Sequence, residues 1–433
     1  MDISREEISA FGALYPRDVR PSQPLKPARR QGWLVTRKSS LTTRGREPCH
    51  RNAIAVWLWV VALAISSAVV MNGAPLPTES LPEDIRVPGG QPPHLVFASD
   101  QPTGELESML AEPGVVRDLI GLKAGIALAP NLTVEEVNLV RELNRDGIPV
   151  TAGLAVTAEQ GYYLNSSNGR QAEVRFEDFE KWTTANGLRW ADIVLDIEPN
   201  IQDFATLRQG RKWHLFLTLL GRYADVRRVR DAKYTYSALI REIRSHGYQV
   251  ETCQFPFIAD ERAVRSSVLE RLTGIVDVRV DREVLMLYTS FNQSLDSALI
   301  WAYGPDAQAI AVGSTTGPTS DPHFARLNWE EFSRDLMVAN HFSHLIGVYN
   351  LEGSVRQGFL ARLKNVHWNE SVTISAESVR RATHLRARVQ RVLWIVSNLP
   401  YFLAVILIVF AWTIVWWKKR RLRRNPQARG AAA

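Results

Sequence analysis

The sequence predicts an α/β fold, a (β/α)8 TIM-type barrel that lies between two transmembrane helices. Within residues 93–366, eight apolar segments rich in Val, Ile and Leu alternate with segments of helical periodicity. Parallel strands buried on both faces have this composition, and eight βα units over about 270 residues are typical of a closed barrel. Uncharged runs at residues 53–70 and 392–417 flank this region. A doubly wound open sheet is the alternative, although the sequence lacks both Gly-x-Gly-x-x-Gly after the first strand and a P-loop.

The elements follow one another in a regular order. Residues 104–121 are expected to be helical in part, with Pro113 interrupting the helix. Further helices are expected at residues 133–147, 176–186, 236–245, 261–272, 295–303, 329–342 and 355–364. Strands are expected at residues 94–99, 122–129, 148–156, 190–198, 248–257, 283–288, 308–314 and 344–351. The second helix has the clearest signals. Thr133 and Glu136 form a capping box, and Asp146-Gly147 provides the stop.

Both uncharged runs are long enough to cross a bilayer of about 30 Å. We expect spans at residues 53–72 and 392–417, the first as a signal anchor, with a cleaved signal sequence as the alternative. Residues 1–52 and 418–433 together carry a net charge of +13, whereas residues 53–417 sum to −6. The positive-inside rule therefore predicts that both termini are cytosolic and that the barrel is extracellular or luminal.

The remaining segments are tails and linkers. Residues 1–52 and 418–433 are expected to be basic cytosolic tails, the first disordered. Residues 73–92 form a Pro-rich linker, and residues 367–391 a linker or helix. The mildly acidic middle lacks the basic face that a nucleic-acid-binding protein needs.

Cysteines and glycosylation motifs fit an exported domain. Cys49 and Cys253 fall on opposite sides of the first span, so no disulfide framework is expected. Cys49 could be palmitoylated, or could be an ordinary cytosolic thiol. Four Asn-x-Ser/Thr motifs, all between the spans, predict a glycoprotein if the chain enters a secretory pathway. They begin at Asn131, Asn165, Asn292 and Asn369.

The candidate site lies where the fourth strand ends. Asp196 and Glu198 stand at i and i+2, so their side chains point to the same face of a strand, and Pro199 ends it. The ends of barrel strands that carry function meet at one mouth. Carboxylates, amides and aromatic hydroxyls at such a mouth suit a carbohydrate. The other strand ends contribute Gln254, Met286, Tyr288, Tyr349 and Glu352.

These residues resemble glycoside hydrolase family 18, the chitinase-like family. Its fourth strand carries Asp-x-x-Asp-x-Asp-x-Glu, whose last two acids match Asp196 and Glu198. Its sixth strand carries Met-x-Tyr-Asp, which Met286 and Tyr288 match. Its eighth strand carries a Trp followed by an acid, where this chain has Tyr349 and an acid three residues on.

The resemblance spans about two-thirds of the chain and is distant. Ala191 and Val194 stand where the family has its first two acids of the fourth-strand motif, and Thr289 replaces the acid of the sixth. These departures leave open whether the barrel cleaves a glycan or only binds one.

The resemblance implies substrate-assisted hydrolysis of glycans that contain N-acetylhexosamine. Glu198 would be the general acid, Asp196 would orient the N-acetyl group, and Tyr288 would hydrogen-bond the acetamido oxygen. Tyr349, Glu352, Gln254 and Met286 would bind substrate, and no metal or other cofactor is implied. Two alternatives remain. One is a non-catalytic carbohydrate-binding barrel of a cell-wall or envelope assembly; the other is a two-carboxylate glycosidase that uses Glu198 and Glu352.

Overall fold

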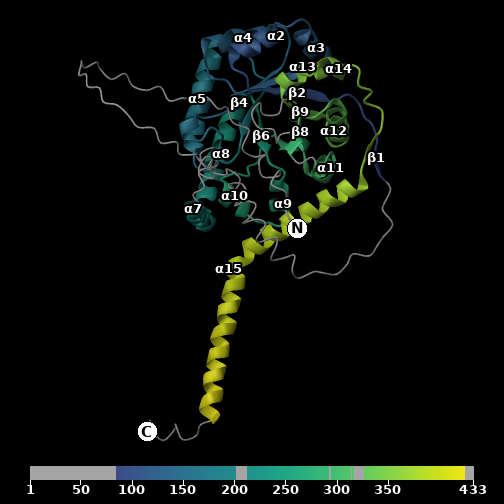
Figure 1. The fold of residues 1–433 in the computed structure, drawn as a ribbon. Helices are drawn as coiled ribbons and strands as arrows, with labels where there is room; N and C mark the ends of the chain where they lie inside the picture. The colour runs from purple at the N-terminus through teal and green to yellow at the C-terminus, as the bar shows by residue number, and fades with distance from the viewer. Residues whose placement is uncertain (1–83, 201–211, 292–293, 314, 316–325, 425–433) are drawn as a thin grey trace, which may run out of the picture.

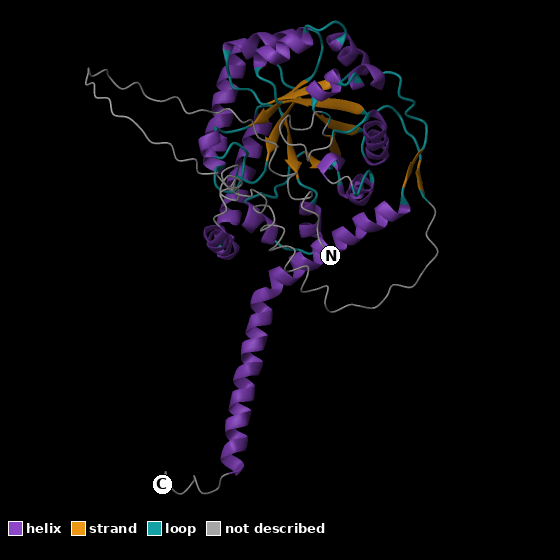
Figure 2. Ribbon diagram, in the orientation of Figure 1, coloured by secondary structure: helices purple, strands orange, loops and turns teal. Residues whose placement is uncertain are grey.

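The chain folds into a closed barrel of eight parallel strands surrounded by helices (Figures 1 and 2). The computed structural model describes residues 84–200, 212–291, 294–313, 315 and 326–424, without the side chains of 212–217 and 420–424. The strands are β2 (His94–Ser99), β3 (Gly125–Leu128), β4 (Val150–Leu154), β5 (Asp192–Asp196), β6 (Gln249–Gln254), β7 (Arg282–Met286), β8 (Ala309–Gly313) and β9 (Leu345–Tyr349). Because β9 pairs with β2, the sheet is closed. The predicted barrel is therefore confirmed, and the alternative of a doubly wound open sheet is wrong.

Helices form the outer layer. They are α2 (Thr103–Leu110), α3 (Val115–Leu122), α4 (Val134–Arg145), α5 (Gly169–Asn186), α7 (Lys212–Ala224), α8 (Val226–Ser245), α9 (Phe257–Ala263), α10 (Val268–Thr273), α11 (Ala298–Tyr303), α12 (Trp329–Phe342), α13 (Leu351–Arg356), α14 (Phe359–Leu363) and α15 (Ala376–Arg424). Short 3-10 turns are η2 (Ala158–Gln160), η3 (Thr289–Phe291) and η4 (Gly304–Asp306).

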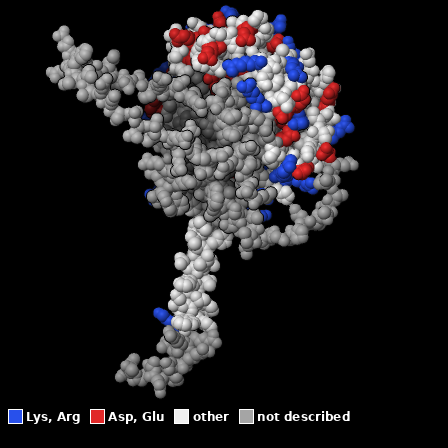
Figure 3. Space-filling view, viewed as in Figure 1, with Lys and Arg blue, Asp and Glu red and all other residues white. Residues whose placement is uncertain are grey.

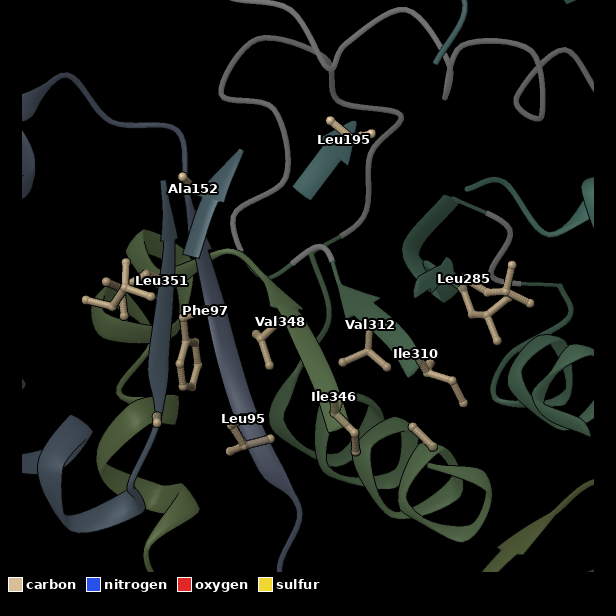
Figure 4. Packing of buried hydrophobic residues seen from close by; sticks show 14 of the residues in the cluster. Leu95, Phe97, Ala152, Leu195, Leu285, Ile310, Val312, Ile346, Val348 and Leu351 are labelled. Carbon is tan, nitrogen blue, oxygen red and sulfur yellow. The ribbon is translucent and has the colours of Figure 1, made fainter. Parts of the chain in front are cut away.

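Strand side chains divide into two alternating sets. One set packs against the helices in the main hydrophobic core, and Figure 4 shows several members, including Leu95, Phe97, Leu195 and Val348. The other set faces the inside of the barrel, where Met286 and its small apolar neighbours form a second cluster. Which set a residue belongs to therefore decides whether it can reach the barrel mouth.

The capping box of α4 is present as predicted. The Thr133 hydroxyl accepts a hydrogen bond from the Glu136 backbone N–H at 3.3 Å, and the Glu136 carboxylate accepts one from the Thr133 N–H at 3.0 Å. The helix ends at Arg145, Asp146 caps it, and Gly147 follows with a φ of 75°. The two hydrogen bonds of the capping box each satisfy a backbone N–H group that has no partner within the helix.

Two helices that periodicity predicted as continuous are broken. The helix expected at residues 261–272 is split into α9 and α10, because the Glu261 carboxylate accepts hydrogen bonds from the Leu269 and Glu270 N–H groups and caps α10. The helix expected at residues 355–364 is split into α13 and α14 at Gly358, whose φ is 69°. A carboxylate cap and a left-handed glycine both stop a helix that an apolar stripe alone would continue.

The segments that enter and leave the barrel pair with each other. Strand β1 (Ile85–Val87) lies within the expected Pro-rich linker and pairs antiparallel with β10 (Val372–Ile374), which lies within the expected linker or helix. Gly89 allows the two segments to approach closely, because a Cβ there would lie 2.3 Å from the backbone of Asn369. The two linkers are thus joined beside the barrel.

Helix α15 contains the whole second predicted span. Within the part of the chain that the structure describes, it is the one helix long and apolar enough to cross a membrane. Large apolar side chains such as Tyr401, Ile408 and Trp412 are exposed along it. The charges on the visible face of the barrel are mixed in sign, whereas the lower part of α15 carries almost none (Figure 3). The first predicted span, residues 53–72, lies outside the described residues.

Pro400 interrupts the hydrogen bonding of α15, because it has no N–H to donate to Val396. The Val396 carbonyl instead accepts a hydrogen bond of 2.8 Å from the Tyr223 hydroxyl of α7. The Arg271 guanidinium of α10 lies 4.6 Å from the centre of the Tyr223 ring. Both helices therefore brace α15 at the turn that the proline weakens.

One predicted glycosylation site is not accessible in the fold. Asn165 is only 1% exposed, and its side-chain nitrogen donates to the Tyr163 carbonyl at 3.0 Å. A glycan cannot be attached to this nitrogen without opening the loop. Asn131 and Asn369 are exposed, and Asn292 lies outside the described residues.

Candidate functional site

The loop after β4 positions the two acids at the end of β5. Leu164 pairs with Ile197 just beyond the strand. The Leu164 N–H donates to the Asp196 carbonyl at 3.0 Å, and the Glu198 N–H donates to the Leu164 carbonyl at 3.0 Å. This bridge extends the strand geometry past Asp196, so the alternation of side chains continues to Glu198.

Asp196 and Glu198 both project into the barrel. Ile193, Leu195 and Ile197 belong to the core between strands and helices, so the alternate residues of β5 face inward. Glu198 is 6% exposed. Cys253 of β6, the register partner of Asp196, packs beside the inner apolar cluster below the acids. The structure thus brings the two predicted acids together at the mouth.

A third carboxylate, Asp100, belongs to this group and was missed in the sequence. It directly follows β2, and its Oδ2 accepts a hydrogen bond from the Tyr349 hydroxyl at the end of the neighbouring strand β9. The signal that could have found it is its place one residue after the predicted first strand, on the same face as Val96 and Ala98. The mouth therefore holds three carboxylates from two strands.

Burial raises the pKa values of all three acids. Burial raises the pKa of Asp196 to about 7, and the charge of Asp100 adds to the effect. Burial also raises the pKa of Glu198 well above its usual value, with further increases from the charges of Asp196 and Asp100. The pKa of Asp100 is raised by the surrounding protein although the side chain retains solvent contact, and the Tyr349 hydrogen bond opposes this increase. Asp196 Oδ1 is buried without a hydrogen-bond partner.

Three tyrosines surround the acids. The rings of Tyr288 and Tyr349 lie 5.7 Å apart between centroids. Tyr162, from the loop after β4, was not predicted; burial and then the charges of Asp100, Asp196 and Glu198 raise its pKa to about 12. Burial likewise raises the pKa of Tyr288. These hydroxyls stay protonated at neutral pH and can donate hydrogen bonds to a bound ligand.

The other predicted binding residues are divided between the two sides of the strands. Met286 lies in the inner cluster, which contacts Tyr288. Glu352 is fully buried and accepts a hydrogen bond from Ser99, which belongs to the helix-facing set of β2. Its Oε2 has no hydrogen-bond partner, and its charge acts on Tyr349. Glu352 therefore lies at the edge of the mouth.

Gln254 differs from its expected position. Its side-chain nitrogen donates to the Val276 carbonyl at 3.3 Å, and the residue is 1% exposed. Because its neighbour Cys253 faces the interior, Gln254 faces the helices. Thr289 stands where glycoside hydrolase family 18 has an acid. Its hydroxyl donates a hydrogen bond to the buried Asp335, so Thr289, like Gln254, has a structural role.

We expect the substitution Asp196→Asn to stabilise the protein at pH 8. The pKa of Asp196 is raised from 3.8 to about 7 by folding, so the folded state binds a proton that the unfolded state releases in this range. The contribution of Asp196 to stability is therefore most favourable below about pH 4 and becomes less favourable as the pH rises to about 7. The variant should avoid this loss, by about 2 kcal/mol at pH 8 after allowance for the solvent contact of the side chain.

Thermal unfolding of the detergent-solubilised full-length protein between pH 4 and pH 8 measures this difference. The exposed Asp231→Asn on α8 is the matched control and should leave the profile unchanged. Parallel pH profiles for wild type and Asp196→Asn would contradict the burial of a protonated Asp196.

Solved structures with similar barrels include three proteins that act on or bind sugars. The 3-keto-D-glucoside 4-epimerase of E. coli is 13% identical, with a TM-score of 0.38, covering 63% of this chain and 99% of the other. Gas2p of Saccharomyces cerevisiae, in complex with laminaritetraose and laminaripentaose, is 11% identical with a TM-score of 0.31, covering 68% and 69%. A D-psicose 3-epimerase in the presence of D-fructose is 14% identical with a TM-score of 0.27, covering 69% and 99%. Values this low say nothing about the chemistry of this chain.

No protein-family profile and no curated protein matches the sequence. The resemblance to glycoside hydrolase family 18 therefore rests on the strand-end residues alone. Among the described residues, no group of three or more His, Cys, Asp and Glu side chains could hold a metal ion.

Proposed function

We propose that the protein is a membrane-anchored glycoside hydrolase that acts on glycans containing N-acetylhexosamine. The observation that supports this proposal is the convergence of Asp196, Glu198 and Tyr288 on the inner face of the barrel mouth. Glu198 is buried beside other carboxylates, which raises its pKa. A carboxyl group that keeps its proton near neutral pH is what a general acid requires.

The proposed reaction uses the substrate as its own nucleophile. Glu198 donates its proton to the glycosidic oxygen as the bond from that oxygen to the anomeric carbon breaks. The acetamido oxygen of the same sugar attacks the anomeric carbon, with the Tyr288 hydroxyl donating a hydrogen bond to it. Asp196 accepts a hydrogen bond from the acetamido N–H and stabilises the positive charge that develops there. Water, deprotonated by Glu198, then opens the cyclic intermediate.

The membrane part of the proposal rests on apolar length and flanking charge. The apolar part of α15 exposes its side chains, and Lys418, Lys419 and further cations follow it within the same helix. With the apolar run at residues 53–72 as a second span, both termini would be cytosolic and the barrel extracellular or luminal. An accessibility test on single cysteines placed at the two termini and in the barrel would check this arrangement.

The function is tested with full-length protein in detergent and chitotetraose as substrate. We expect new reducing ends to accumulate with enzyme and time, and we expect saturable binding by calorimetry. Binding without any cleavage would favour the non-catalytic carbohydrate-binding barrel. Neither binding nor cleavage would reject the proposal.

The two-carboxylate glycosidase is the second candidate, since Glu352 is buried near Tyr349 with one carboxylate oxygen unpaired. In that mechanism Glu352→Ala abolishes cleavage, whereas Tyr288→Phe has little effect. The substrate-assisted mechanism requires the opposite result for Tyr288→Phe. Substrates without an N-acetyl group separate the two candidates further.

A further inference from the structure

A cavity of about 480 Å³ lies beside the mouth on the same end of the barrel. It is formed by the loops after β3 and β4 and by α5. Its polar lining comes mainly from Asn131, Gln160, Tyr162, Arg170, Arg175 and Asp178. The mechanism proposed above uses none of these side chains directly. The cavity is large enough for one sugar residue of a bound chain.

Arg175 is the best-defined polar group in this cavity. Its Nη2 donates a hydrogen bond to the Pro130 carbonyl, while its Nε is buried without a hydrogen-bond partner. Burial lowers the pKa of Arg175, and the charges of Glu136 and Asp178 oppose that decrease. A guanidinium remains charged at any physiological pH, so a buried donor of this kind is costly unless an acceptor binds it.

Arg170 adds a second cation to the wall. Its ion pair with Glu173, 3.1 Å long, is exposed, and such pairs contribute little. Asp178 is the one acid in the lining, so the lining carries a net positive charge. The amides of Asn131 and Gln160 supply neutral donors and acceptors for sugar hydroxyls.

Tyr162 connects the cavity to the mouth. It lines the cavity, and it lies close enough to Asp100, Asp196 and Glu198 for their charges to act on its hydroxyl. A glycan with one residue at the carboxylates would therefore extend its neighbouring residue into the cavity. An aromatic ring in the lining, here that of Tyr162, suits the apolar face of a sugar.

We propose that this cavity is a binding subsite for a sugar that carries a carboxylate, such as a hexuronic acid, next to the sugar at the mouth. Arg175 lines the cavity, and the planar fork of its guanidinium matches a carboxylate geometrically. The inference deepens the proposed function and rests on it, because it names the substrate as an acidic glycan.

Calorimetry on the full-length protein in detergent tests this subsite with two tetrasaccharides. One is chitotetraose, which is neutral; the other alternates N-acetylglucosamine with glucuronic acid. We expect the acidic tetrasaccharide to bind at least about tenfold more tightly, as a charged hydrogen bond implies. Arg175→Gln should remove this preference without changing chitotetraose binding. Lys181→Gln, on the exposed face of the same helix, is the control.

Several results would overturn the inference. Equal affinity of wild type for both tetrasaccharides would reject the subsite and leave the proposed function intact. A parallel loss of both affinities in an Arg175→Gln variant that keeps the wild-type melting curve would also reject it. If that variant melts early, Arg175→Lys, which keeps the charge but not the fork, takes its place in the same comparison. Failure of wild type to bind either tetrasaccharide would reject the proposed function and the subsite together.

Discussion

Replacement of Glu198 by Gln is expected to lower the rate of chitotetraose cleavage by about 10²–10⁴-fold, with little change in binding. Gln has nearly the same shape as Glu but cannot transfer a proton to the glycosidic oxygen. The side chain is buried and held on the inner face by the backbone bridge to Leu164, so the substitution should not move it. Loss of a buried carboxyl with a raised pKa should, if anything, stabilise the fold.

The rate is measured as new reducing ends, and binding as heat of titration, on the same preparations. Glu177→Gln, an exposed acid on α5, is the matched control and should behave as wild type. Because the pKa of Glu198 is raised well above its usual value, the wild-type rate should decline at a pH well above that at which an exposed glutamate loses its proton. If the Glu198→Gln variant retained a tenth or more of the wild-type rate, Glu198 could not be the group that transfers the proton.

The barrel was predictable because its strands are buried on both faces. Apolar runs of this kind give the number and order of the strands. The helix expected at residues 329–342 is present as α12, and the structure adds a capping box at Asn328 that sets its start. The two broken helices were not predictable. Their breaks depend on the Glu261 carboxylate, which caps a helix that begins later in the chain, and on the positive φ of Gly358. Periodicity carries no information about either.

Only part of the candidate site follows from local sequence. The i, i+2 spacing places Asp196 and Glu198 on one face wherever the strand lies. Tyr162 reaches the acids through the bridge between Leu164 and Ile197, a contact that no local pattern encodes. Gln254 shows the reverse problem, since a shift of one residue along a strand changes the face that a side chain occupies.

Replacement of Asp260 by Ala is expected to reduce the free energy of unfolding by about 3–5 kcal/mol and to loosen α15 from the barrel. Asp260 of α9 is fully buried. Its carboxylate accepts hydrogen bonds from Arg386 and Gln390 of α15, each 2.9 Å long, and from the Tyr303 hydroxyl at 2.6 Å. Alanine would leave the Nε of Arg386, the amide of Gln390 and the fully buried hydroxyl of Tyr303 without this acceptor.

Thermal unfolding and hydrogen exchange of residues 376–391 in the detergent-solubilised protein measure the two effects. Asp306→Ala is the control. Asp306 also pairs with Arg386, at 2.7 Å, but its side chain is 42% exposed. This substitution should therefore reduce the free energy of unfolding by less than about 1 kcal/mol. The paired substitution Asp260→Leu with Arg386→Met should recover most of the loss, since it buries no charge. Unchanged exchange in Asp260→Ala would mean that apolar contacts alone hold α15 against the barrel.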